Sequence, residues 1–163
     1  LRLALWHSLD QDMQMVAQGL QSDLREVGVE LELKPVNYAE LIQSAQVRRR
    51  VPMSLTGWNV SLPDPKDMLG ILFDGRAVTN PATQNLSFYD NPEVTRLMDE
   101  AAGAVELSAR FEAYRRAERI VVKEAPWIFL GSKNLFALRQ PWIKGSLVEP
   151  IWWYRFDRIR AER

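Results

Sequence analysis

The side chains best suited to chemistry in this chain are one histidine and two closely spaced aspartates. His7 ends a short alternating apolar stretch, and the chain has no cysteine and no Asp/Glu-x-x-His spacing to pair with it. Asp64 and Asp67 lie three residues apart at an expected helix start, where carboxylates cap the helix or face its dipole. The sequence contains no glycine-rich phosphate loop, no G-x-S-x-G and no H-E-x-x-H. We therefore expect no catalytic residue, no bound metal and no cofactor.

A different stretch of the chain points to ligand binding. Residues 54–69 run from an apolar segment into Gly57-Trp58, then through a polar loop to Asp64-Pro65, which has the pattern of a helix start. In α/β proteins, ligand sites lie in loops between the end of a strand and the next helix. Trp58 could contact a ligand or pack in the core, and both alternatives stay open from the sequence. The segment indicates a binding cleft rather than an active site.

Composition limits the class of protein further. The 163 residues are 47% apolar and 26% charged, with a formal net charge of zero, as in an ordinary globular domain. Zero net charge argues against nucleic acid as a partner, because phosphate binding needs a basic excess. The basic clusters at 48–50 and 155–163 are interpreted as solvated surface or interdomain contacts. The strand-like alternation of Leu1, Leu3 and Leu5 at the very start suggests a piece of a longer protein.

Hydrophobic periodicity predicts alternating strands and helices in the first 58 residues. Strands are expected at 1–6, 29–34 and 52–58, with helices between them. Asp10 and Asn37 are expected N-caps, and Gly28 is the expected left-handed residue after the first helix. A β-α-β-α-β order favours a parallel sheet with crossover helices, which is an α/β fold.

The second half of the chain is predicted to be mainly helical. Pro65 opens a short helix, residues 73–86 form a loop, and Asn91-Pro92 opens a helix to about residue 105. Ser108 is the expected cap of a helix to residue 124. One face of that helix is expected to hold Phe111, Tyr114, Ala117 and Val121.

The expected elements after residue 125 are strands. Apolar runs at 126–130 and 135–138 predict a hairpin, and 151–156 predicts a final strand. Trp127 and Trp142 are expected in the core.

The order and spacing of these pieces resemble the C-terminal lobe of bacterial extracellular solute-binding proteins of family 5, the dipeptide/oligopeptide-binding group of ABC importers. The matching features extend over nearly the whole chain. They are the L…L…VGVELEL unit around residues 20–33, Gly57-Trp58 with Asp64-Pro65, Asn85 followed by the Tyr-Asp-Asn-Pro-Glu of 89–93, the 114–128 run, and the Trp-Ile-Lys-Gly turn at 142–145.

The resemblance implies a periplasmic-binding-protein-like fold, with residues 1–163 as a single α/β lobe of a two-lobed receptor. Such a receptor captures a small solute, with a peptide favoured, between its lobes and delivers it to the permease subunits in the membrane. The implied partners are therefore the solute, the absent N-terminal lobe and the ABC permease. The implied location is periplasmic, or extracellular and membrane-anchored.

The resemblance also implies which residues contact the solute. Trp58 would form a wall, the backbone at Gly57 and Asn59 would pair with an extended peptide, and polar contacts would come from Ser61, Asp64 and Asn85. Many peptide-binding members carry an Asp three residues after this Trp, where it pairs with the α-ammonium of the ligand. Here that position is Ser61, which supplies no counter-charge.

Three explanations of Ser61 stay open at this point. The solute lacks a free amine, Asp64 supplies the charge, or the absent lobe meets the ammonium. Two other functions are also considered. The same lobe would serve as the sensor domain of a transcription regulator, and a hydrolase is disfavoured because no nucleophile–base pair is present.

Overall fold

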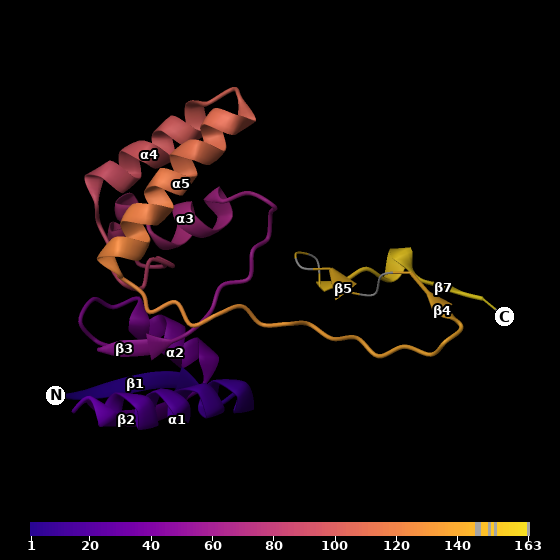
Figure 1. Ribbon diagram of the computed structural model, residues 1–163. Helices are drawn as coiled ribbons and strands as arrows, with labels where there is room; N and C mark the ends of the chain where they lie inside the picture. Colours follow the sequence, from indigo (N-terminus) through magenta and orange to yellow (C-terminus); the bar gives the residue numbers. More distant parts are fainter. Residues whose placement is uncertain (146–147, 150, 152, 163) are drawn as a thin grey trace.

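The computed structural model describes residues 1–145, 148–149, 151 and 153–162. Its N-terminal part is a parallel three-stranded sheet of β1 (Arg2–Ser8), β2 (Glu30–Val36) and β3 (Met53–Leu55), in the order β2-β1-β3 (Figure 1). The crossovers are α1 (Gln11–Glu26) and α2 (Tyr38–Ala45). Arg2 pairs with Glu30 and Leu5 with Met53, so β1 is the central strand. The predicted β-α-β-α-β order and parallel sheet are confirmed.

The two helices cover opposite faces of the sheet because side chains alternate along β1. Leu3 and Leu5 pack into a cluster with Ala17 of α1, together with residues of β2 and β3. Ala4 and Trp6 belong to a second cluster, which contains Leu41 of α2. Alternate side chains of β1 therefore pack on opposite faces of the sheet, one set against α1 and the other against α2.

Local capping signals are read correctly in this part of the chain. The Asp10 carboxylate accepts the Met13 amide at 3.1 Å, and the Asn37 side chain accepts the Glu40 amide at 2.8 Å. Gly28 has a φ of 81°, the left-handed region that glycine enters without steric cost. The third strand is shorter than the predicted 52–58, and residues 56–65 leave the sheet as a loop.

A separate group of helices forms the second core. It consists of α3 (Lys66–Leu72), the short 3₁₀ helix η1 (Gly75–Thr79), α4 (Pro92–Gly103) and α5 (Leu107–Glu124), which stack away from the sheet in Figure 1. Leu72, Val94, Leu97 and Val121 are among its buried side chains.

Two details of α5 differ from the prediction. Its N-cap is Glu106 rather than Ser108, which lies within the helix. On the predicted apolar face, Tyr114, Ala117 and Val121 are buried, whereas Phe111 is partly exposed near the solvent-facing start of the helix.

The chain after α5 does not form the predicted hairpin. Residues 126–140 contain no strand and run as an extended segment past the sheet toward the C-terminal end (Figure 1). Alternation predicts an extended backbone, but a hairpin also needs the two runs to pair, and they do not. Trp127 packs against the helical core, 5.2 Å from the ring of Phe73, as expected. Trp142 is 52% exposed, so its expected core position is wrong.

Short strands complete the described part. β4 (Ile143–Lys144) pairs antiparallel with β7 (Arg160–Ala161), and β5 (Val148–Glu149) with β6 (Trp153–Tyr154). The 3₁₀ helix η2 (Phe156–Arg158) lies between β6 and β7. Of the final strand predicted at 151–156, only β6 is strand, and residue 152 lies outside the described residues. Across the described residues, no helix combines the length and apolar character that crossing a membrane requires.

The end of α5 yields a stability test. Ala125 has a φ of 48°, a left-handed conformation that costs energy for any residue with a Cβ. We expect Ala125→Gly to raise the free energy of unfolding by up to about 1 kcal/mol in urea titrations. The control is Ala104→Gly at the end of α4, where φ is −72° and no such strain is relieved. That variant should be less stable than wild type, and a shared direction for both changes would contradict the explanation.

Candidate functional site

The candidate site is the loop 56–65, which connects the carboxyl end of β3 to α3 (Figure 1). Because the sheet is parallel, β1 and β2 end at the same edge, at Ser8 and Val36. His7 lies at this edge but is buried, with its Nδ1 2.8 Å from the Ser8 carbonyl oxygen, which fits a structural role. The loop therefore lies where an α/β sheet positions ligand contacts.

A buried carboxylate fixes the shape of this loop. Asp67 is 8% exposed, and its Oδ2 accepts the backbone amide of Ser61 at 2.7 Å. The same oxygen accepts the indole Nε1 of Trp58 at 3.4 Å. Trp58 is half-buried and packs against the helical core, so one face of its ring supports the fold. The network brings Trp58, Ser61 and Asp67 together.

Three of the predicted contact residues are available to solvent. Gly57 and Asn59, which flank Trp58, are exposed on the loop, and so is Ser61. Their amides and side chains lie on a segment that Asp67 holds at two points. The loop thus presents polar groups from a constrained backbone, which lowers the ordering cost of binding.

Asp64 is engaged in an ion pair rather than free. Its Oδ1 accepts the Lys66 amide at 2.8 Å, and Arg110 Nη2 donates to both carboxylate oxygens at 3.0 and 2.8 Å. Arg110 also donates to the Ala101 carbonyl at 3.0 Å, which fixes the guanidinium. Partial burial alone raises the pKa of Asp64. The Lys66 amide and the Arg110 guanidinium more than offset this, so the pKa lies below its usual value. The charge of Asp64 is therefore balanced within the chain.

Asn85 is part of the framework. It is fully buried, and its amide nitrogen donates to the carbonyl oxygens of Asp74 at 3.2 Å and Tyr89 at 2.8 Å. Its Oδ1 accepts the Tyr89 amide at 3.0 Å and the Ser87 hydroxyl at 3.1 Å. Both donors and both acceptor positions of the side chain are used. The Asn85 side chain thus holds the 80–91 segment, and its contact with a solute stays a prediction.

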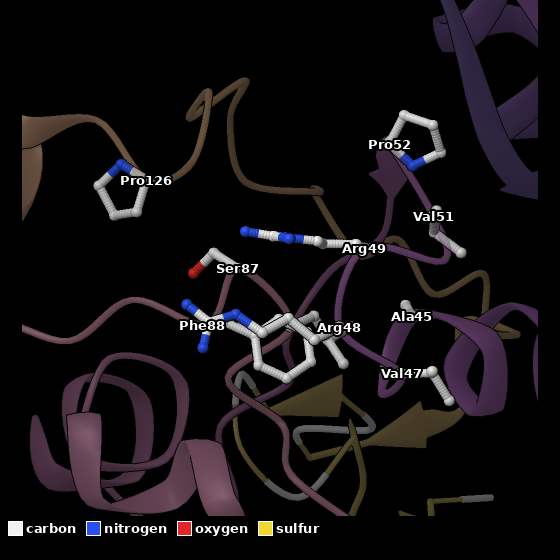
Figure 2. A pocket seen from close by; sticks show the side chains of 10 residues that line it. Ala45, Val47, Arg48, Arg49, Val51, Pro52, Ser87, Phe88 and Pro126 are labelled. Atoms are coloured by element: carbon white, nitrogen blue, oxygen red, sulfur yellow. The ribbon is translucent and has the colours of Figure 1, made fainter.

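Metal binding has no support in this geometry. Nowhere in the described ranges do three or more His, Asp or Glu side chains gather in a way that could hold an ion. A shallow pocket of about 310 Å³ exists elsewhere, lined by residues between 45 and 52, residues 86–88 and Pro126 (Figure 2). None of the predicted contact residues lines it.

The similarity to known proteins extends over almost the whole chain. Residues 3–80 match the family model described as bacterial extracellular solute-binding proteins, family 5 Middle. The probable D,D-dipeptide-binding periplasmic protein DdpA of Escherichia coli K12 is 26% identical over 90% of this chain and 28% of its own length. The glutathione-binding protein GsiB of Pectobacterium atrosepticum is 28% identical over 94% of this chain and 30% of its own length.

A solved structure gives the same result. Clavulanic acid biosynthesis oligopeptide binding protein 2 superposes with a TM-score of 0.88 at 26% identity, covering 100% of this chain and 31% of that protein. The chain is therefore similar to the family 5 solute-binding proteins, through the family model over residues 3–80 and through these relatives over most of its length. It spans less than a third of the length of each of these relatives. The α/β fold of a family 5 lobe, expected from the sequence, is confirmed.

Two interactions that hold the loop 56–65 in place were not predicted from the sequence. Asp67 lies in the first turn of α3, as expected for a dipole partner, and it also accepts hydrogen bonds from the preceding loop. Its position in the first turn of α3 suits both roles, so the sequence does not separate them. Arg110 lies 46 residues from Asp64, and no local pattern indicates that pairing. The contacts of Gly57, Trp58, Asn59 and Ser61 with a solute stay predictions.

Removing the Asp67 carboxylate should loosen the loop. Asp67→Ala leaves the Ser61 amide and the Trp58 indole without their acceptor, which should lower the free energy of unfolding by about 1–3 kcal/mol. The indole N–H signal of Trp58, assigned by NMR with Trp58→Phe, should move in the same variant. Ser61→Ala is the matched control, because it keeps the backbone amide. An unmoved Trp58 signal in Asp67→Ala would show that this carboxylate does not hold the loop.

The Asp64–Arg110 pair predicts a pH dependence. Because the folded-state pKa of Asp64 is below 3.8, the pair stabilises the fold above about pH 4. The contribution is lost as the pH falls through the lower folded-state pKa. Thermal unfolding of wild type and Asp64→Asn should therefore differ at neutral pH and converge at the acid end. Asp23→Asn, at an exposed position of α1, serves as control. A gap that stays constant with pH would contradict the pairing.

Proposed function

We propose that this chain is one lobe of the substrate-binding component of an ABC importer. The whole protein captures a small solute, with a peptide favoured, between two lobes and delivers it to the permease subunits in the membrane. It acts without catalysis, in the periplasm or at the outer face of the membrane. Residues 1–163 form the C-terminal lobe, and the N-terminal lobe supplies the other wall of the site.

The observation that carries this proposal is the constrained loop 56–65. Asp67 holds it at Ser61 and Trp58, while the Gly57 and Asn59 positions stay exposed at the carboxyl edge of the sheet. An extended peptide can pair with such a backbone, and the Trp58 ring can cover its side chain. The names of the relatives support a peptide-like solute, since DdpA is named for a dipeptide and GsiB for glutathione.

The charges of the loop narrow the solute further. Asp64 is paired with Arg110, and Asp67 is buried and occupied by loop donors. Neither carboxylate is free to take the place of the aspartate that many family members carry at the position of Ser61. Of the three explanations for Ser61, two therefore remain: the solute presents an uncharged group here, or the other lobe meets its ammonium. The sensor-domain alternative has no observation in its favour, since the relatives described above are binding proteins by name.

Solute binding should be visible as thermal stabilisation of the full-length protein. A solute at a hundredfold excess over its Kd adds about 2.7 kcal/mol to the free energy of unfolding. Dipeptides, oligopeptides, N-acetylated peptides, oligosaccharides and metal chelates form the panel. We expect Trp58→Ala to weaken binding of the stabilising solute about tenfold or more, because apolar contact is lost. Val105→Ser, at an exposed position, should leave binding unchanged.

The same panel separates the explanations for Ser61. If N-acetylated and free-amine peptides stabilise wild type equally, the loop faces an uncharged group, and Ser61→Asp should favour the free amine. The isolated 163-residue chain should bind weakly or not at all, because it supplies only one wall. Micromolar affinity of the isolated chain would overturn the two-lobe requirement, and sustained hydrolysis of peptides by the full-length protein would overturn the non-catalytic role.

A further inference from the structure

Figure 2 shows a pocket that includes residues just before β3. The loop 56–65, called the solute loop below because of its proposed role, leaves the other end of that strand. The first wall of the pocket comes from the end of α2 and the segment that leads into β3, including Arg48, Arg49 and Pro52. Its second wall comes from Leu86, Ser87 and Phe88 of the loop before α4, with Pro126 after α5. The pocket therefore joins the sheet part of the chain to the helical part, and neither Trp58 nor Ser61 lines it.

Two arginines give this pocket its charge. Arg48 and Arg49 are both exposed, and in Figure 2 their guanidinium groups point toward the side of the pocket where Ser87 lies. The Arg48 Cζ lies 5.8 Å from the ring centroid of Phe88, which helps to orient it. Across the described residues, the acidic side chains form their ion pairs with other cations, and none pairs with Arg48 or Arg49.

The remaining lining is apolar. Val51, Pro52, Leu86, Phe88 and Pro126 surround the arginines and the Ser87 hydroxyl. Guanidinium groups bind planar carboxylates and phosphates through paired N–H donors. Apolar walls next to such donors suit a ligand whose anionic group is attached to a compact apolar body.

Backbone strain marks the same place. Within the described ranges, the non-glycine residues with positive φ are Arg49 at 65°, Phe88 at 52° and Ala125 at 48°. The Ala125 conformation is explained by the end of α5. Arg49 and Phe88 lie on separate segments, and both line this pocket. Strained residues of this kind gather at ligand sites, where the surrounding structure holds side chains in place.

We propose that this pocket is a second binding site, which takes a small organic anion with a carboxylate or phosphate on an apolar or aromatic body. Arg48 and Arg49 bind the oxyanion, and Phe88 packs against the body. The site is independent of the solute loop, because the two share no side chain. A bound anion would also link the sheet and the helical part of the chain.

The test uses phenyl phosphate as the probe, with inorganic phosphate beside it, in calorimetric titrations of the full-length protein. Phenyl phosphate should bind more tightly than inorganic phosphate, and added salt should weaken the binding of both. Arg48→Gln and Arg49→Gln should each weaken binding of phenyl phosphate about tenfold. Arg50→Gln is the matched control, because Arg50 belongs to the same basic run but does not line the pocket.

Several results would overturn the proposal. One is the absence of binding at millimolar probe, including the case in which the rest of the protein covers the pocket. Another is an equal loss in Arg50→Gln, which would indicate general charge attraction. Competition by the transported solute, or loss of binding in Trp58→Ala, would place the probe in the solute site instead. Unchanged thermal unfolding of the glutamine variants would show that their effects on binding do not come from misfolding.

Discussion

The position of the solute loop depends on one buried carboxylate. Asp67 belongs to α3, yet its Oδ2 takes donors from Ser61 and Trp58 in the segment before that helix. A carboxylate that is 8% exposed needs such donors, because leaving it without them would cost more than the hydrogen bonds themselves return. The loop and the helix therefore adopt their geometry together. The exposed positions at Gly57 and Asn59 follow from that geometry and not from any contact of their own.

The parallel sheet sets where the two sites of the chain can lie. β1 is central and β3 is three residues long, so the segments entering and leaving β3 are only about 10 Å apart. The leaving segment is the solute loop, and the entering segment carries Arg48 and Arg49. Side chains at the two ends of a strand face different edges of the sheet. Two kinds of recognition can therefore exist close together without sharing a residue.

Local signals in the sequence predict the first half of the fold well. Asp10, Asn37 and Gly28 each act within four residues of the helix end they mark, so their roles are readable from spacing alone. The failures involve partners that are distant in sequence. The alternation at 126–138 predicts an extended backbone, but it does not identify what that backbone pairs with. The backbone hydrogen bonds of Asn85 were not predicted for the same reason, since polar side chains that bind a ligand and those that bind the backbone look alike in sequence.

Charge is the clearest example of information that only the structure supplies. The chain has a formal net charge of zero, which suggests surfaces without a strong preference for either sign. The structure distributes the pairs unevenly. In the loop 56–65, Asp64 is neutralised by Arg110, so the recognition proposed there would depend on shape and on backbone hydrogen bonds. At the other end of β3, Arg48 and Arg49 have no acidic partner among the described residues, so the field there is positive. A neutral total thus contains one region where the charges are balanced and one where two arginines lack an acidic partner among the described residues, so the two proposed sites would select different chemistry.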